Sequence, residues 1–519
     1  MLQLFFDKKN FLSNFYNLTV CMLAVGLCTS KALVSLSATT MFILSLTSLN
    51  FINIKEIIKK KKSLLFLIIF FLYYCLSSIW SSNLLVSTQD IVSKLNLIII
   101  PIALLIKPID SKWLERLFTL FIWAVVGTSV YNFVYYQISP HTIKDIRKLS
   151  LFVSHIRFSL FICFSIGLIF KKFFFTTNLW WRLLYFIFFV WLLFYLNASE
   201  VLSGILALLG GVLLCCLIGI FRHSKKYRPV YFIGLVLILG SILMIGLYIN
   251  KHSFNSKFFT DLSHPAFTKL GNVYTHDTLS KEMENGNYIY SFICTKEIDS
   301  VWPKISTSPL DQVNVNGYQR RIVLYRYLTS KGLPKDAFGL RNLTKEDLLS
   351  IESGVPSILE KKKGIISKID FYIKNFNLNQ NPNGNSVLQR IEYWRVGSSI
   401  FFDHLIFGVG IGDYKSSFQK EYIKKSSLLY LENRLETHQQ FLSVLIATGC
   451  IGGILFALIF YFYILHTSAN PLAIYFIGII LASFLVEDTL TTLAGMSFFA
   501  LFYTLFQTTI SSLSGKAEK

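Results

Sequence analysis

Charged residues are scarce in this sequence, and acidic residues are the scarcest of them. Only 15% of the 519 residues are charged, with 29 aspartates and glutamates against 50 lysines and arginines. A soluble domain carries roughly 25% charged residues, so this composition excludes an ordinary soluble protein. Instead, 53% of the residues are hydrophobic. They occur in runs long enough to cross a bilayer, which predicts an all-α polytopic membrane protein.

The basic residues are distributed in a way that argues against a nucleic-acid partner. Residues 250–436 contain 25 lysines and arginines against 19 acids, which leaves 25 against 10 in the mostly apolar remainder. There the cations form short clusters between apolar runs, as the positive-inside rule predicts for membrane proteins. We therefore expect membrane lipids, and no nucleic acid, as partners.

Cysteine pairs and targeting signals are also missing. Of the eight cysteines, only Cys294 lies in the long polar region, so no disulfide is expected within that region. No CxxC pair occurs, and we expect neither a metal nor a cofactor. The first residues, MLQLFFDKKNF, lack the parts of a signal peptide, so the first apolar run is expected to be retained as a span.

The apolar runs divide into about twelve predicted spans of roughly 20 residues each. The expected spans are 11–29, 32–52, 63–80, 92–106, 113–137, 151–170, 180–197, 201–220, 229–249, 438–465, 471–487 and 491–510. The fourth contains Pro101, so we expect it to be broken or re-entrant. Residues 1–249 form the first membrane part, 250–436 a polar insert, and 437–519 the last three spans with the tail.

Short basic loops predict the orientation of these spans. If the spans alternate, most basic loops fall on one side, which the positive-inside rule identifies as cytoplasmic. These loops are 8–9, 55–62, 107–112, 171–172, 222–228 and 516–519, with 137–149 as a mildly basic exception on the other side. Both termini are therefore expected in the cytoplasm and residues 250–436 outside it.

The insert is too long for a structureless loop, and its patterns predict helices. Amphipathic or capped helical stretches occur at 315–333, 344–355 and 387–403. The last of these is followed by GVGIGDY (408–414), whose alternating glycines allow a sharp turn close to a ligand or to another helix. A nucleotide loop is excluded because no strand precedes it. A tight turn without any ligand contact is the simpler alternative.

Ionisable residues from separate segments are predicted to meet at the extracytoplasmic membrane face. They are Arg157, Arg390, His438, Glu487 and Asp488. Each alone has a plain interpretation as a solvated or snorkelling boundary residue. Together they suit one chemistry, because guanidinium groups bind diphosphates through forked hydrogen bonds and an imidazole accepts a proton from a hydroxyl. This favours transfer from a polyprenyl-diphosphate donor.

Two motifs in this region resemble those of the O-antigen ligase/polymerase superfamily. The first is R-x-x-x-W followed by G-x-G-x-G, formed by Arg390, Trp394 and the three glycines of 408–412. The second is HQQFLSVLIATGCIGG, which begins at His438 and has glutamine at 439 where the family usually has asparagine. The plan of twelve spans with one large loop agrees, and the loop is similar to the enlarged one of ligase-like proteins in Bacteroidetes-type bacteria.

The resemblance implies a metal-independent glycosyltransferase of the bacterial inner membrane, acting in lipopolysaccharide biosynthesis. Such enzymes move a glycan from undecaprenyl diphosphate to a hydroxyl acceptor, here lipid A-core, at the periplasmic face. It implies His438 as the base, with Arg390 and Arg157 as diphosphate binders. Further expected substrate contacts are Gln389, Tyr393, Arg320 and Arg321, with possible support from Glu436, Glu487 and Asp488.

One position departs from the family pattern. Many members have Ser-Arg at the outer start of a span, where this chain has Ser199 and Glu200. Either Arg157 or an arginine of the insert (Arg320 or Arg321) replaces the missing arginine, or the donor is bound differently.

Other functions stay open at this point. A polysaccharide polymerase or a protein O-oligosaccharyltransferase would share the motifs, because only the acceptor changes. A transporter would place ionisable residues in mid-bilayer and use paired discontinuous helices. The predicted spans have few such charges. The large insert is the only feature that favours a membrane scaffold with a binding domain.

Overall fold

A computed structural model describes most of the chain. The described residues are 8–48, 61–138, 149–222, 228–253, 266–277, 280, 282–285, 287–313, 319–358, 382–383 and 386–514. They form two compact units. The first comprises 1–239, 393–427 and 434–519, and the second comprises 240–392 with 428–433. Residues 393–427, which the sequence pattern groups with the insert, thus belong to the first unit.

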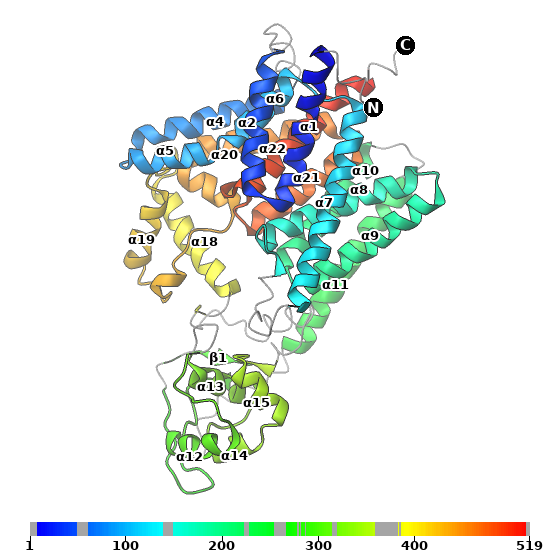
Figure 1. The fold of residues 1–519 in the computed structure, drawn as a ribbon. Coiled ribbons are helices and arrows are strands. Elements are labelled where there is room, and N and C mark those ends of the chain that lie inside the picture. Colours follow the sequence, from blue (N-terminus) through cyan, green and yellow to red (C-terminus); the bar gives the residue numbers. More distant parts are fainter. Residues whose placement is uncertain are drawn as a thin grey trace. The chain divides into compact units, whose positions relative to one another are not determined.

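Helices occupy all twelve predicted spans (Figure 1). They are α1 (Lys8–Thr29), α2 (Lys31–Leu46), α4 (Lys62–Leu76) with η2 (Ser77–Trp80), α5 (Leu84–Ser93) with α6 (Asn96–Ile106), α7 (Ser111–Ile138), α8 (His155–Phe175), α9 (Leu179–Ala198), α10 (Leu202–Arg222), α11 (Arg228–Ser253), α20 (Gln440–Thr467), α21 (Pro471–Val486) and α22 (Leu493–Ser514). Among the described residues, seven helices are long and apolar enough to cross a membrane, or eight if α5 and α6 form one bent span. The all-α polytopic fold is confirmed, whereas twelve crossings remain a prediction.

Two predicted boundaries differ from the structure. The fourth span is broken, as expected, but its 41° bend lies between α5 and α6 and Pro101 lies inside α6. Polar side chains gather at the bend, where Lys94 pairs with Asp90 and Asp90 also accepts a hydrogen bond from the Tyr74 hydroxyl. The helix expected from residue 151 begins at His155, because the Ser154 side chain caps it by accepting a hydrogen bond from the Arg157 amide.

Small and aromatic residues hold the first unit together. Helix α10 packs along α21, α20 along α4, and α22 along α6. At the α10–α21 contact a Cβ on Gly478 would lie 2.7 Å from the Gly210 carbonyl oxygen, so only small residues allow this approach. Phenylalanines fill the space around α22, where the Phe502 ring packs edge-on against Phe121 of α7 and at a tilt against Phe164 of α8.

The second unit contains a small helical core. Its elements include α12 (Thr295–Ile305), α13 (Arg320–Ser330), α14 (Ala337–Arg341), α15 (Lys345–Glu352), η4 (Leu431–Asn433) and a two-stranded antiparallel sheet of β1 (Met283–Glu284) and β2 (Asn287–Tyr288). Trp302, Leu324 and Leu328 are buried in this core. Helix α15 begins with Thr344 as its N-cap, as the sequence pattern predicts, and Asp347 completes a capping box with it.

The glycine turn joins α18 (Ser386–Asp403) to α19 (Tyr414–Lys424) and packs against other helices. The amides of Val409 and Gly410 donate to carbonyls of α20, over distances of 2.9 and 3.0 Å. These carbonyls lie just before Gly449, where α20 is kinked. Gly408 and Gly410 have φ of +73° and +83°. Their sharp turn therefore serves a helix contact, one of the two uses that the sequence suggested.

We expect Gly449→Ala to destabilise the protein. Gly449 has φ of +65°, and an added Cβ would lie 2.1 Å from the Ile406 carbonyl oxygen. A non-glycine residue held in such a conformation costs about 1–3 kcal/mol, and the clash adds to this. In a thermal unfolding assay in detergent, each kcal/mol lowers the midpoint by roughly 2–4 °C. The control is Gly127→Ala, because no atom lies within 4 Å of that added Cβ. Equal midpoints for both variants would contradict the expectation.

Candidate functional site

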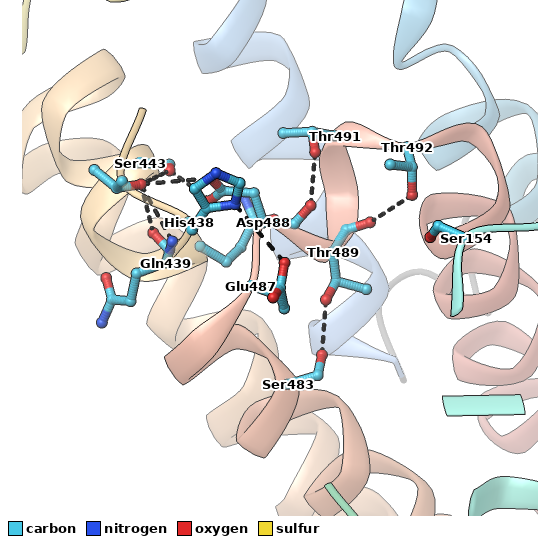
Figure 2. A network of polar contacts seen from close by, with 12 residues as sticks. Ser154, His438, Gln439, Ser443, Ser483, Glu487, Asp488, Thr489, Thr491 and Thr492 are labelled. Atoms are coloured by element: carbon cyan, nitrogen blue, oxygen red, sulfur yellow. Dashed lines mark hydrogen bonds and ion pairs between the residues drawn. The ribbon is translucent and has the colours of Figure 1, made fainter. Parts of the chain in front are cut away.

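Four helix ends of the first unit meet in one polar cluster (Figure 2). His438 precedes α20, Glu487 and Asp488 follow α21, Thr492 precedes α22 and Arg157 lies in the first turn of α8. Ion pairs and hydrogen bonds join these helix ends. The structure thus brings together four of the residues singled out in the sequence, namely Arg157, His438, Glu487 and Asp488.

His438 lies at the edge of the cluster with a carboxylate behind it. Its Nδ1 is 3.8 Å from Oε2 of Glu487, and its side chain is 36% exposed, whereas that of Glu487 is only 4% exposed. The ring centroid of Tyr393, on α18, lies 5.7 Å from that of the imidazole. Because one imidazole nitrogen faces a carboxylate, the other is left to face solvent or a substrate. This is the arrangement of an oriented base.

Arg157 is buried behind the same carboxylate. Its Nη1 is 3.6 Å from Oε2 of Glu487. Its Nη2 donates to the Asp488 carbonyl at 2.8 Å, and its Nε donates to the Thr492 hydroxyl at 3.1 Å. A buried carboxylate needs a partner of opposite charge. The Glu487 carboxylate therefore lies between a guanidinium and an imidazole.

A hydrogen-bonded group fixes the segment that carries His438. The Ser443 hydroxyl donates to Asp488 at 2.6 Å and also contacts the hydroxyl of Thr437, which is fully buried. The Tyr414 hydroxyl lies 2.9 Å from the Ser443 hydroxyl. Burial raises the pKa of Asp488, and burial together with the nearby Asp488 charge raises the pKa of Tyr414. The group connects α19, α20 and the loop after α21.

The backbone at His438 adopts an uncommon conformation, with φ of +48°. Such a conformation costs of order 1–3 kcal/mol in a non-glycine residue and is typical of functional positions. The next residue stabilises it, because the Gln439 side chain accepts a hydrogen bond from the Leu442 amide at 2.6 Å and caps α20. Asparagine is a preferred cap residue, and here the longer glutamine side chain caps the helix at this position.

Gln440 connects the start of α20 to the loop after α21. Its Oε1 accepts a hydrogen bond from the Leu490 amide at 2.8 Å. Sequence reasoning missed this residue, together with Thr437, Ser443 and Tyr414. Only one feature of the sequence pointed to them, namely the run of polar side chains at 437–440 immediately before an apolar stretch long enough to cross a membrane.

The other predicted site residues lie elsewhere in the two units. Glu436, in the first unit, is 4.0 Å from the Lys415 ammonium. Gln389 and Arg390 are half-buried on α18 in the second unit. In that unit Arg320 donates to the Pro309 carbonyl, and Arg321 pairs with Asp299 and Asp311. Substrate contacts by these residues stay predictions.

Two further features bear on the sequence analysis. Within the described ranges, no three or more histidine, cysteine, aspartate or glutamate side chains are grouped so that they could hold a metal ion. Ser199 ends α9 and is buried, with its hydroxyl donating to the Leu196 carbonyl at 3.0 Å. Glu200 follows with φ of +53°.

Residues 349–457 match the family model described as O-antigen ligase. The matched segment contains α18, the glycine turn and His438. No curated protein matches the chain. The family predicted from the sequence motifs is thereby confirmed for this segment: residues 349–457 of this membrane protein form an O-antigen ligase domain.

Proposed function

We propose that this protein transfers a glycan from undecaprenyl diphosphate to a hydroxyl of lipid A-core at the periplasmic face of the inner membrane. The O-antigen ligase family is a family of glycosyltransferase-like enzymes. The observation that carries the proposal is the contact between His438 and Glu487, 3.8 Å apart, within that family's matched region and the adjoining helix end. An oriented imidazole is the group that a hydroxyl acceptor requires.

The proposed reaction proceeds in one displacement. The acceptor hydroxyl gives its proton to Nε2 of His438, and its oxygen attacks the anomeric carbon of the glycan. The bond between that carbon and the diphosphate oxygen breaks, and undecaprenyl diphosphate leaves with the bonding electrons. Glu487 holds the Nδ1 side of the ring and stabilises the imidazolium that forms. A general base of this kind contributes about 10²–10⁴-fold to a rate.

The diphosphate needs positive charge where negative charge develops. We assign this role to Arg390, whose guanidinium suits two diphosphate oxygens at once. The resemblance implies the same role for Arg157. Its contacts with Glu487, Asp488 and Thr492 favour a positioning role instead, in which it holds the Glu487 carboxylate against His438.

A deletion strain tests the proposal. Without the ligase, lipid A-core should carry no polymer, and full-length polymer should accumulate on the polyprenyl carrier. A polymerase would give lipid A-core with single repeat units instead. A protein O-oligosaccharyltransferase would leave lipid A-core unchanged and remove glycan from proteins. Normal polymer on lipid A-core would reject the proposed acceptor.

Glu487→Gln should lower kcat by about tenfold or more with little change in KM. The amide keeps the shape of the side chain but removes the charge that orients and stabilises the His438 ring. Rates of glycan transfer in reconstituted membranes would measure the two constants separately. The matched control is Glu432→Gln, because Glu432 is an exposed glutamate of η4 to which no role in the site is assigned. If the two variants behave alike, Glu487 has no special role.

A further inference from the structure

An apolar groove lies at the far end of α8 from the polar cluster. It has a volume of about 200 Å³ and lies between the last turns of α8 and the first half of α9. Its walls are aromatic, formed mainly by Phe170, Phe173, Phe174, Tyr185, Phe186 and Phe189. From Arg157 to Phe173, the rise of an α-helix gives a separation of roughly 24 Å. The groove is therefore separate from the proposed catalytic site.

The groove opens on a surface that suits lipid. Phe170, Phe174 and Phe186 are each more than half exposed, although they lie on helices apolar enough to cross a membrane. Trp180 and Trp181, at the start of α9, are 79% and 48% exposed. Tryptophans gather at the level of lipid headgroups. The mouth of the groove thus lies near a headgroup layer, and its length extends towards the acyl chains.

Cations lie at this end of α8 and α9, and one of them contacts the wall of the groove. The Arg182 guanidinium lies over the Phe173 ring, 5.3 Å from its centroid. Within the described part of the chain, no carboxylate pairs with Arg182. Lys171 and Lys172 both contact Glu115, with Nζ–O distances of 2.9 and 2.5 Å. Both lysines turn towards α7 rather than into the groove, but one carboxylate cannot neutralise two ammonium groups, so this end of α8 keeps an excess of positive charge beside Arg182.

We infer that this groove binds an anionic phospholipid, with an acyl chain between the phenylalanines and the headgroup phosphate on Arg182. An acyl chain gains from burial against aromatic walls, at about 25 cal/mol per Å² of apolar area. A headgroup with net negative charge is attracted by the cations, at about 1 kcal/mol for each one near the surface. A zwitterionic lipid such as phosphatidylcholine also carries a positively charged ammonium group, which the same cations repel. The inference does not depend on the reaction proposed above.

Native mass spectrometry of the full chain tests the inference. The purified protein is offered phosphatidylglycerol and phosphatidylcholine with identical acyl chains. We expect the first to be retained several-fold better. Arg182→Gln should remove this preference, and Arg182→Lys should restore part of it. The control Arg222→Gln changes another exposed arginine, at the end of α10, and should keep the preference.

Four results would overturn the inference. One is equal retention of the two lipids by the unaltered protein. Another is an undiminished preference in Arg182→Gln. The third is release of phosphatidylglycerol by excess glycerol 3-phosphate, because that would mean that the cations bind a phosphate alone and that the groove contributes nothing. Loss of the preference in Arg222→Gln would show a diffuse charge effect and would equally reject a defined site.

Discussion

His438→Ala is expected to abolish glycan transfer while the protein still reaches the membrane. Without the imidazole, no side chain of the proposed site takes the acceptor proton, and the loss of a general base lowers a rate by about 10²–10⁴-fold. A glycosyltransferase slowed this much leaves lipid A-core without visible polymer. The measurement is the polymer on lipid A-core, separated by gel electrophoresis, together with the amount of the variant in membranes.

A second variant is needed because the backbone at His438 is strained, so alanine there could disturb the fold as well as remove the imidazole. Alanine is poorly suited to the φ of +48° observed there, whereas asparagine tolerates this conformation. His438→Asn should therefore keep the segment folded and still lose transfer. His404→Ala, which changes an exposed histidine after α18, should transfer normally. If either His438 variant makes polymer at the normal level, His438 is not the base.

Much of the membrane fold could be predicted because it follows from local patterns. Apolar runs located a helix in each of the twelve predicted spans, since a bilayer span requires a minimum length of apolar residues. Thr344 predicted the start of α15, because a helix N-cap is a signal carried by the local sequence. The ends of these helices were predicted less accurately than their positions along the sequence. A cap at Ser154 and a polar cluster near Asp90 placed two helix ends where hydropathy alone could not.

The site could be predicted only in part. Loop charges and the alternation of spans placed Arg157, His438 and Glu487 at one membrane face, and all three are in contact through Glu487. The supporting hydroxyls were not foreseen. Ser443 is joined to Asp488, which lies 45 residues later in the sequence, and no local pattern announces such a pairing. The unusual conformation of His438 likewise results from tertiary contacts.

Arg390→Lys is the other variant for which we expect a large effect. Lysine keeps the positive charge but cannot form two parallel hydrogen bonds with a diphosphate. If Arg390 stabilises the departing diphosphate, the loss falls on the transition state, where one lost donor lowers kcat by about 10²–10³-fold. We therefore expect strongly reduced transfer from a polyprenyl-linked donor in reconstituted membranes, with normal folding.

A control on the same helix distinguishes the loss of forked hydrogen bonds at Arg390 from a general effect of replacing an arginine of α18 with lysine. Arg395 is exposed on α18, five residues after Arg390, so Arg395→Lys alters the same side chain type on the same element. It should transfer glycan at the normal rate. Full activity of Arg390→Lys would mean that a point charge suffices, and bidentate binding would be rejected. Inactivity of Arg390→Lys together with Arg395→Lys would indicate that α18 tolerates no change, and the diphosphate role of Arg390 would lose its support.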